Sequence, residues 1–303
     1  MYVNTFSKAM RERFGRQVYK LSLDGGMTCP NRDGTVGRGG CIFCGERGSG
    51  EFAERTSGDL NGQIERAKRR VAFKARPDAG YIAYFQSFTN TYAPVDYLER
   101  LFMPIAQRDD ICALSVATRP DCLGDEVIRL LGRINRVKPV WVELGLQTAH
   151  DSTARLINRG YDTPVYDDAV RRLADAGCET VTHIIIGLPG ETESMIYDTV
   201  RHVGDIGSDG VKLHLLYIVR GTALEKMYLS GDYTPLGQDE YIRLLAGCLR
   251  RLPRETVIHR MTGDGAKREL IAPMWSADKK RVLNAINEYL TRENVVQGEL
   301  WES

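Results

Sequence analysis

Three cysteines close together are the side chains in this sequence best suited to chemistry. Cys29, Cys41 and Cys44 stand in a glycine-rich segment directly after a strand-like run, residues 18–24, with no fourth cysteine or histidine nearby. A fully ligated iron–sulfur cubane takes four cysteines, so three thiolates suit a [4Fe-4S] cluster with one iron left open. That open iron could chelate the amino and carboxylate groups of S-adenosylmethionine.

The same cysteines allow a second interpretation, a structural zinc site completed by a distant histidine. Spacing alone leaves both interpretations open. The other cysteines are scattered without metal-ligand spacing, which is typical of buried free thiols: Cys112, Cys122, Cys178 and Cys248. An odd total of seven cysteines argues against a disulfide framework and favours a reducing compartment.

Length and composition fit an ordinary globular protein. The chain has 303 residues, of which 43% are hydrophobic and 27% charged, enough for one large α/β domain with a small extension. No apolar run reaches the roughly 18 to 20 residues that cross a bilayer. The N-terminal twenty residues lack the apolar core of a secretory signal. We therefore expect a cytoplasmic protein with no membrane partner.

Positive charge is concentrated near the N-terminus. Residues 1–76 carry fifteen lysines and arginines against eight acidic residues, a net charge of +7 in a chain whose total is +1. Arg66, Lys68, Arg69 and Arg70 fall on one predicted helix. Such a surface could attract a polyanion, including the phosphates of an RNA. A merely solvated basic helix would produce the same pattern.

Strand-like and helical segments alternate through most of the chain. The strand-like runs are residues 18–24, 81–86, 111–118, 140–146, 181–187 and 211–218. Strands separated by helices predict a parallel sheet with right-handed crossovers. Six such units can form either an open doubly wound sheet or a barrel.

Side-chain alternation favours the barrel. In residues 140–147, Glu143, Gly145 and Gln147 share one face, and apolar residues occupy the other. A doubly wound sheet, covered by helices on both sides, would be apolar on both faces. We therefore predict a partial (β/α)6 TIM-type barrel with a polar lumen over residues 1–252. A small α/β extension, residues 253–303, adds one strand and one helix. Loops at the carboxyl ends of barrel strands form active sites, and the cysteine segment is such a loop.

Five motifs in order make the chain similar to a known family. They are ATRPDCL (117–123), ELGLQT (143–148), NRGY (158–161), ADAG (174–177) and HIIIGLPGE (183–191), and they follow the cysteine segment DGGMTCPNRDGTVGRGGCIFC (24–44). Together they resemble the YhcC-like family of radical SAM proteins and the radical domain of the Elongator catalytic subunit, over residues 13–290. The cysteine spacing, C-x11-C-x2-C, departs from the C-x3-C-x2-C usual in the superfamily but matches this family. The resemblance implies a radical SAM fold and reductive cleavage of S-adenosylmethionine to a 5′-deoxyadenosyl radical.

The resemblance also implies residue roles. Cys29, Cys41 and Cys44 would ligate the cluster. Residues 87–89 stand where the superfamily often has Gly-Gly-Glu, which contacts the methionine amine. Because no glutamate is present, the hydroxyls of Ser87 and Thr89 or backbone carbonyls would make that contact.

The remaining implied contacts to the cofactor come from strand ends. Gln147 would hydrogen-bond the ribose, and Arg159 would pair with the methionyl carboxylate through its guanidinium. Ile186, Leu216 and Tyr217 would lie against the adenine. Arg159 as a surface arginine at a helix end, and Leu216 as ordinary core, are the structural alternatives.

Substrate contacts are expected near the last predicted strand. His259, Arg260 and Asp264 follow it in a polar, glycine-containing segment, which could equally be a structural loop. His183 and His214 lie on strands and could face the lumen. A satisfied core histidine is the alternative for both.

The Elongator subunit modifies C5 of the tRNA wobble uridine and joins a radical domain to an acetyltransferase. This chain stops soon after its predicted barrel and has no room for acetyl transfer. We therefore expect tRNA as partner and trimming of a carboxymethylaminomethyl group to aminomethyl as the reaction. A flavodoxin or ferredoxin would donate the electron. The alternatives are a radical SAM enzyme acting on a non-RNA substrate, and a metal-bearing RNA-binding module without turnover.

Overall fold

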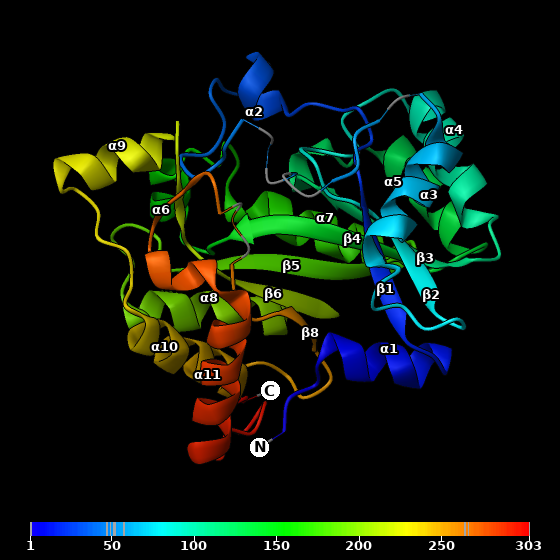
Figure 1. Ribbon diagram of the computed structural model, residues 1–303. Helices are drawn as coiled ribbons and strands as arrows, with labels where there is room; N and C mark the ends of the chain where they lie inside the picture. The colour runs from blue at the N-terminus through cyan, green and yellow to red at the C-terminus, as the bar shows by residue number, and fades with distance from the viewer. Residues whose placement is uncertain are drawn as a thin grey trace.

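The architecture is a curved parallel sheet with helices on its outer side. The computed structural model describes residues 2–46, 48, 50, 53–56, 58–263, 265 and 267–302. Seven strands pair in the order β1-β2-β3-β4-β5-β6-β8, all parallel. They are β1 (Val18–Leu23), β2 (Gly80–Phe85), β3 (Ile111–Thr118), β4 (Val140–Gln147), β5 (Glu179–Ile186), β6 (Gly210–Leu215) and β8 (Val257–Arg260). Figure 1 shows the sheet, with α1 (Phe6–Phe14) below it and α2 (Pro30–Asp33) above.

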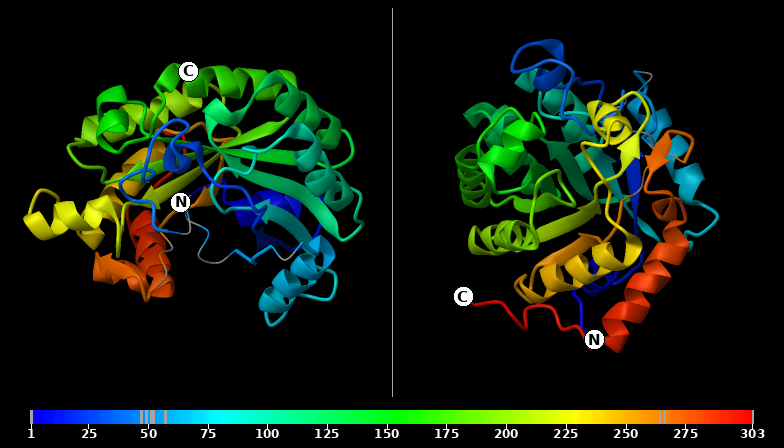
Figure 2. Two further views of the ribbon diagram at one scale, coloured as in Figure 1. Left: turned by 90° about the horizontal axis from the view of Figure 1, so that it is seen from above. Right: turned by 90° about the vertical axis from the view of Figure 1, so that its left-hand side faces the viewer.

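Crossover helices cover the convex face of the sheet (Figure 2). These helices are α3 (Leu60–Val71), α4 (Val95–Ala106), α5 (Asp125–Asn135), α7 (Thr163–Asp175), α8 (Glu193–Asp205) and α10 (Gln238–Arg250). Apolar residues of each strand alternate outward and join these helices in the main core, as Val142, Leu144 and Leu146 of β4 do. The outer face of the sheet therefore packs against helices, and the inner face lines a lumen. This arrangement confirms the predicted α/β partial barrel.

The seventh strand belongs to the segment that was predicted to be an extension. β8 pairs with β6 along Gly210, Val211 and Lys212, so this strand is part of the sheet. The residues after it form β9 (Leu270–Ala272), which pairs antiparallel with β7 (Ile218–Val219), a short turn η2 (Met274–Ala277) and α11 (Lys279–Arg292). The division at residues 252 and 253 remains a prediction.

Short backbone bridges protect both edges of the sheet. Thr5 bridges Ile258 at the β8 edge, and Glu54 bridges Leu23 at the β1 edge. Unpaired edge strands invite association with other chains, and these contacts remove much of that exposure. Smaller helical elements lie in the loops: α6 (Asp151–Leu156), α9 (Ala223–Ser230) and η1 (Pro120–Cys122). Among the described residues, no helix combines the length and apolarity that a membrane crossing requires.

Helix α1 closes the N-terminal end of the lumen. Met10 of α1 is buried in a cluster with inward-facing residues of four strands, Ile82, Ala113, Trp141 and Val181. The Trp141 ring makes edge contacts with Phe6 and Phe14, with centroid distances of 6.4 and 6.5 Å. Its Nε1 donates to Glu179 Oε2 at 2.7 Å. Apolar side chains of α1 and of these strands therefore cover the end of the lumen opposite the loops.

Replacing the central residue of this seal should weaken the fold. Trp141→Ala removes a fully buried ring, and we expect a loss of about 3 to 5 kcal/mol in the free energy of unfolding, measured by urea titration. Phe73→Ala provides the matched control, because Phe73 is 85% exposed and its loss should change stability by no more than about 0.5 kcal/mol. Equal effects of the two substitutions would contradict the assigned role of α1.

Candidate active site

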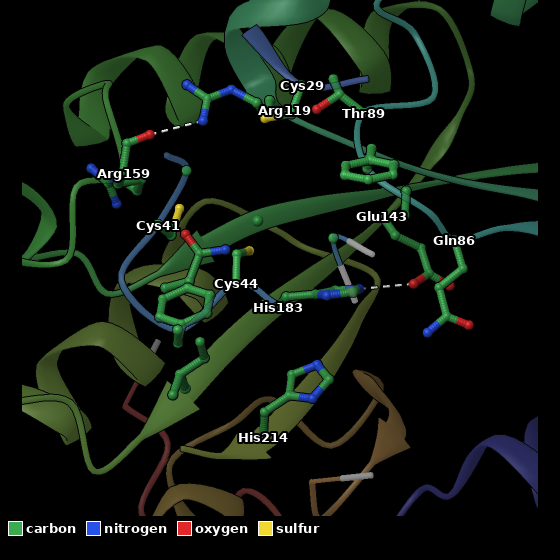
Figure 3. A pocket seen from close by; sticks show the side chains of 18 of the residues that line it. Cys29, Cys41, Cys44, Gln86, Thr89, Arg119, Glu143, Arg159, His183 and His214 are labelled. Carbon is green, nitrogen blue, oxygen red and sulfur yellow. Dashed lines mark hydrogen bonds and ion pairs between the residues drawn. The ribbon is translucent and has the colours of Figure 1, made fainter. Parts of the chain in front are cut away.

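One cavity of about 210 Å³ lies at the open end of the sheet and joins the cysteine loop to the lumen (Figure 3). Its wall combines residues of the loop, of the strand ends and of the polar lumen face. From the loops come Cys29, Arg32, Cys41, Phe43, Cys44, Phe88, Thr89, Arg119, Arg159 and Tyr161; from the strands and their ends come Tyr84, Gln86, Glu143, Gly145, Gln147, His183, Ile185, Lys212, His214, Leu216, Tyr217 and Arg260. The structure thus brings all three predicted cluster ligands to the mouth of the barrel.

Side-chain donors hold the cysteine loop in place. Arg32 donates through Nη2 to the carbonyls of Cys44, at 2.9 Å, and Gly45, at 2.5 Å. Asn31 donates to the Asn158 carbonyl at 2.6 Å, and Asn158 donates back to the Gly40 carbonyl at 2.7 Å. The loop is therefore anchored to the NRGY segment, which is more than a hundred residues away in sequence.

The environment of the loop favours thiolates. A hydrogen bond from the Cys44 thiol lowers the pKa of Cys41 against the effect of burial, and Arg119 and Asn31 act in the same direction. Burial instead raises the pKa of Cys178 and that of Cys122 to about 12. Because thiolates are the metal-ligating form of cysteine, the loop fits a metal cluster and the two scattered cysteines do not.

The geometry does not support the zinc alternative. A zinc ion would draw four ligand atoms to within about 2.3 Å of one point. Among the described residues, no three His, Cys, Asp or Glu side chains converge in a way that could hold a single metal ion. Thiolates around a four-iron cubane stand farther apart than ligands of a single ion, and three cysteines around a cavity suit that larger group.

Arg119 is a central residue of the site to which the sequence analysis assigned no role. It follows β3 in the ATRPDCL motif and binds both carboxylate oxygens of Asp121, at 2.9 and 2.7 Å. Its Nη1 donates to the Arg159 carbonyl at 2.8 Å, and its guanidinium lies 4.9 Å from the centre of the Tyr161 ring. These contacts use three of its five N–H donors. The ATRPDCL motif, which contains Arg119, was the feature of the sequence that could have indicated a role for this residue.

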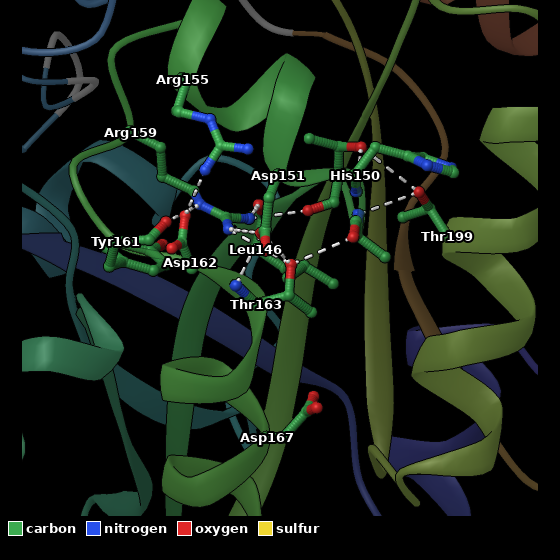
Figure 4. Close-up of polar contacts among 12 residues, drawn as sticks. Leu146, His150, Asp151, Arg155, Arg159, Tyr161, Asp162, Thr163, Asp167 and Thr199 are labelled. Carbon is green, nitrogen blue, oxygen red and sulfur yellow. Dashed lines mark hydrogen bonds and ion pairs between the residues drawn. The ribbon is translucent and has the colours of Figure 1, made fainter.

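Arg159 lines the cavity, as the resemblance implied, but its donors are turned into the protein. Its side chain is fully buried and each of its five N–H donors has an acceptor within the protein (Figure 4). The acceptors are the carbonyls of Tyr161 (2.9 Å), Leu146 (2.7 Å) and Thr148 (2.7 Å), the carboxylate of Asp151 (3.3 Å) and the hydroxyl of Thr163 (3.3 Å). A methionyl carboxylate would have to displace one of these. The geometry therefore favours a structural role for a buried arginine, which differs both from the carboxylate contact and from the surface arginine that was its alternative.

Gln147 reaches the cavity as predicted, through a distortion of β4. The register against β5 shifts between Gly145 and Gln147, and Gln147 has a φ of +62°, a conformation rare for residues other than glycine. A side chain at Gly145 would collide with the Gln147 amide, which explains the glycine there. With its nitrogen donating to the carbonyls of Leu146 and Gly145, the Gln147 amide oxygen can accept from a ligand.

Of the other residues predicted to contact the cofactor, three line the cavity and two do not. Thr89, Leu216 and Tyr217 line the cavity as expected. Two predictions were off by one residue. Ile186 is buried in the outer core and Ile185 faces the cavity, and Phe88 lines the wall in place of the buried Ser87. Ile185 and Ile186 are adjacent residues of β5 and point to opposite sides of the sheet, whereas Phe88 lies in a bend after β2 with a φ of +55°.

The predicted substrate residues also separate. Arg260 lines the cavity. His259 lies instead at the sealed end, where its ring is 4.9 Å from Phe6 and 6.2 Å from Trp141. Neighbouring residues can both face inward because the register of β8 shifts here, which reorients side chains at a bulge. Asp264 lies outside the described residues, and its role stays a prediction.

A buried charge network forms the floor of the cavity. Glu143 Oε1 accepts from Lys20 Nζ at 2.8 Å and from Ser115 Oγ at 2.6 Å. Its Oε2 accepts from His183 Nε2 at 2.8 Å and from Lys212. Burial alone would raise the pKa of Glu143, but Lys20 and Lys212 hold it well below its usual range. The alternation of side chains along residues 140–147 predicts that Glu143 lies on the polar face, but it does not indicate these partners.

Histidine and tyrosine side chains extend this network. Burial, reinforced by the charge of Lys212, lowers the pKa of His183 to about 4, so the ring is neutral at physiological pH and donates to Glu143. Lys212 also donates to the Tyr84 hydroxyl at 2.9 Å. The lumen therefore carries interacting polar residues from β1 through β6, and both histidines expected to face it, His183 and His214, do so.

The predicted basic helix is partly paired with carboxylates. Arg66 and Arg70 of α3 bind the two oxygens of Glu54, at 2.7 and 2.8 Å. Lys68 binds Glu65 at 3.0 Å and also Asp110, and Arg108 shares both of these carboxylates. Arg69 is exposed, so α3 and its surroundings keep part of their positive charge.

Comparison with known proteins gives matches over nearly the whole chain. The family described as the radical SAM superfamily matches residues 32–203, and the radical SAM C-terminal domain matches residues 208–292. YtqA of Bacillus subtilis is 45% identical over 99% of this chain and 92% of its own length. YhcC of Escherichia coli K12 is 36% identical over 98% of this chain and 94% of its own.

Two further matches are more remote. The tRNA uridine(34) acetyltransferase of Methanocaldococcus jannaschii is 27% identical over 47% of this chain and 26% of its own length. The solved structure of Elp3 from Methanocaldococcus infernus superposes with a TM-score of 0.70 at 17% identity, and covers 92% of this chain and 64% of that chain. The structural match supports the same fold.

Removing the carboxylate at the floor should destabilise the protein. Glu143→Gln leaves the buried Lys212, and the partly exposed Lys20, without a counter-charge, and we expect a loss of about 3 to 5 kcal/mol at pH 7 by urea unfolding. Because the folded-state pKa lies below the ordinary 4.5, this stabilisation is present above that pH and is lost as the pH falls further. The variant should lack that acid dependence.

A matched control is Glu193→Gln, which breaks an exposed ion pair with Arg243 of 2.7 Å. Its cost should stay below about 1 kcal/mol. A Glu143→Gln protein as stable as this control would show that the floor network contributes little.

Proposed function

The chain belongs to the radical SAM superfamily, among its YhcC-like members related to Elongator, and we propose that Cys29, Cys41 and Cys44 bind its [4Fe-4S] cluster. The protein is thus a radical SAM enzyme that uses this cluster and S-adenosylmethionine. Bound together, they supply a 5′-deoxyadenosyl radical, and the protein positions the substrate and excludes water. The observation that carries the assignment is the shared cavity, which the three cysteines and the polar lumen line together.

Cofactor contacts follow from the same cavity wall. We assign the ribose to the Gln147 amide oxygen, the methionine amine to Thr89, and the adenine to Leu216 and Tyr217, which line the wall. Arg119 suits the methionyl carboxylate better than Arg159, because two of its N–H donors remain after its contacts with Asp121 and Arg159. A flavodoxin or ferredoxin would deliver the electron.

For the substrate we propose a tRNA whose wobble uridine carries a carboxymethylaminomethyl group at C5. The support is the matching protein named tRNA uridine(34) acetyltransferase, together with a cavity that ends in polar and charged groups. A single base turned out of its stack could enter such a cavity, as enzymes that act on bases require.

The reaction would convert the side chain to aminomethyl. The methylene carbon between amine and carboxylate loses one hydrogen atom, then one electron and one proton, which leaves a C=N bond. Water cleaves that bond to the amine and glyoxylate. The electron lost after the hydrogen atom would return to the cluster and replace the one that cleavage of S-adenosylmethionine takes from it. Summed over one turnover, the two electrons of the substrate thus convert S-adenosylmethionine to methionine and 5′-deoxyadenosine, and no further oxidant is needed.

A second candidate is a radical reaction on a non-RNA substrate. The specific observation in its favour is the pairing of cations of α3 with Glu54, Glu65 and Asp110, which weakens the strongest surface signal for RNA. Activity on tRNA, tested below, separates the two candidates.

Cysteine substitutions test the cluster assignment. Cys41→Ala should abolish iron retention and the brown colour of the anaerobically purified protein, whereas Cys178→Ala should keep both, because Cys178 is buried away from the loop. Wild type should hold about four irons per chain. Loss of iron from Cys178→Ala to the same extent would show that the ligand assignment is wrong.

Nucleoside analysis tests the substrate. Purified enzyme, S-adenosylmethionine, a reductant and tRNA bearing carboxymethylaminomethyluridine should yield aminomethyluridine, with one 5′-deoxyadenosine per product, by mass spectrometry. Cys41→Ala is the control and should yield neither. Unchanged tRNA in this assay, together with unchanged wobble uridines in a deletion strain, would refute the tRNA proposal.

A further inference from the structure

The deep part of the cavity carries more positive than negative charge. Among the described residues that line it, Glu143 is the one carboxylate, and Lys212 and Arg260 lie at the same depth. Lys20, at the margin, adds a third cation through its bond to Glu143. Charges removed from water require partners, so an excess of buried cations marks a place for an anion.

Glu143 cannot neutralise the excess. A carboxylate offers about four lone-pair positions, and those of Glu143 are taken by Lys20, Ser115, His183 and Lys212. No acceptor position is left on it for Arg260. The guanidinium of Arg260 makes no hydrogen bond or ion pair with another side chain in the described part of the chain.

Strand register places Arg260 beside the other inward groups. His183 of β5 pairs with Lys212 of β6, and Lys212 pairs with Arg260 of β8. The three side chains therefore form a row across neighbouring strands on the lumen face. Arg260 is half-buried at the end of that row, where a ligand that descends from the cluster side would meet it.

His214 supplies a second unsatisfied group close by. It lies two residues beyond Lys212 on β6, with its ring 5.0 Å from that of His183. Its Nε2 is buried and has no hydrogen-bond partner within the described residues. Burial and the nearby cations keep the pKa of His214 well below its usual value, so the neutral ring can donate one hydrogen bond.

We propose that Arg260 and His214 form a carboxylate-binding subsite at the floor of the cavity, which holds the carboxylate of the substrate side chain. This inference rests on the proposed function, since it assigns a site to the carboxymethyl group of that substrate. A guanidinium pairs with a carboxylate through two parallel hydrogen bonds, and this fixes orientation as well as affinity. The methylene carbon next to the carboxylate is thereby held on the cluster side of Arg260.

The subsite also distinguishes substrate from product. Once the carboxylate-bearing fragment leaves, the aminomethyl product has no anion for Arg260 and instead places a positive amine near Lys212 and Arg260. Like charges at short range repel in a low-dielectric site. Recognition therefore favours the unreacted side chain and assists release of the reacted one.

Binding without turnover tests the subsite. Anticodon stem-loop RNAs with carboxymethylaminomethyl-, aminomethyl- and unmodified uridine are titrated against cluster-loaded enzyme without reductant, by fluorescence anisotropy. Wild type should prefer the carboxylate-bearing RNA by about ten- to hundredfold, the range of a hydrogen bond to a charged group. Arg260→Gln should lose this preference and bind the other two RNAs as wild type does. Arg260→Lys should keep part of it.

The control is Arg129→Gln, an equal change of charge on exposed α5, which should leave the preference intact. Iron content and thermal unfolding of each variant confirm an intact fold. Isothermal titration calorimetry should show unchanged S-adenosylmethionine binding by Arg260→Gln. A loss there would mean that Arg260 holds the cofactor carboxylate, and would overturn the inference.

The remaining outcomes distinguish failure of the carboxylate subsite from failure of the tRNA proposal. Wild type that binds all three RNAs equally, or Arg260→Gln that keeps the preference, overturns the subsite and leaves the tRNA proposal standing. Equal weakening of all three RNAs by Arg260→Gln assigns the residue to a phosphate and also overturns it. Failure of every RNA to bind overturns the tRNA proposal and the subsite together.

Discussion

Glu143 lies between Lys20 and Lys212 inside the barrel, where Glu143 and Lys212 are shielded from water and Lys20 keeps about a fifth of its side chain exposed. Burial of an ionised group is costly unless it is paired and its remaining lone pairs are satisfied. Ser115 and His183 complete that requirement. One carboxylate therefore links β1, β3, β4, β5 and β6 through its four contacts, and the strands must keep a register that brings these partners together.

This network divides the lumen into two parts. Below it, Trp141 and the apolar residues of α1 seal the barrel, so water and substrate enter from the loop side. Above it lies the cavity, with its polar floor and the cysteine loop as its rim. Radical chemistry requires a site that excludes competing reactions, and a lumen closed at one end meets that need.

Arginines build the upper half of the site mainly through backbone carbonyls. Arg32 donates to a carbonyl of the cysteine loop, and Arg159 donates to carbonyls at the end of β4. Arg119, which precedes η1, donates to the carbonyl of Arg159. A guanidinium has five donors in a fixed plane, so one side chain can set several carbonyls relative to one another. Loops without regular secondary structure thereby acquire a defined shape. Arg260 differs from these three because it lines the cavity and its donors have no partner among the residues that the structure describes.

Short-range patterns in the sequence determined the class of fold and the lumen side of most strand residues. Strand and helix lengths, and the alternation that placed Glu143 and Gln147 together, depend only on neighbouring residues. The cysteine loop was likewise evident, because its three thiols are close in sequence. Local patterns of this kind are visible before the chain folds.

Only the tertiary structure decided the partners of the charged residues and the side chains at irregular backbone. Arg159 is saturated by five acceptors that lie between residues 146 and 163, and Glu54 and Asp110 reach α3 from other segments. A register shift turns Arg260 into the cavity while His259 packs against Phe6 at the sealed end. Such outcomes depend on contacts between distant segments and on bulges that break the two-residue period, so no local pattern can encode them.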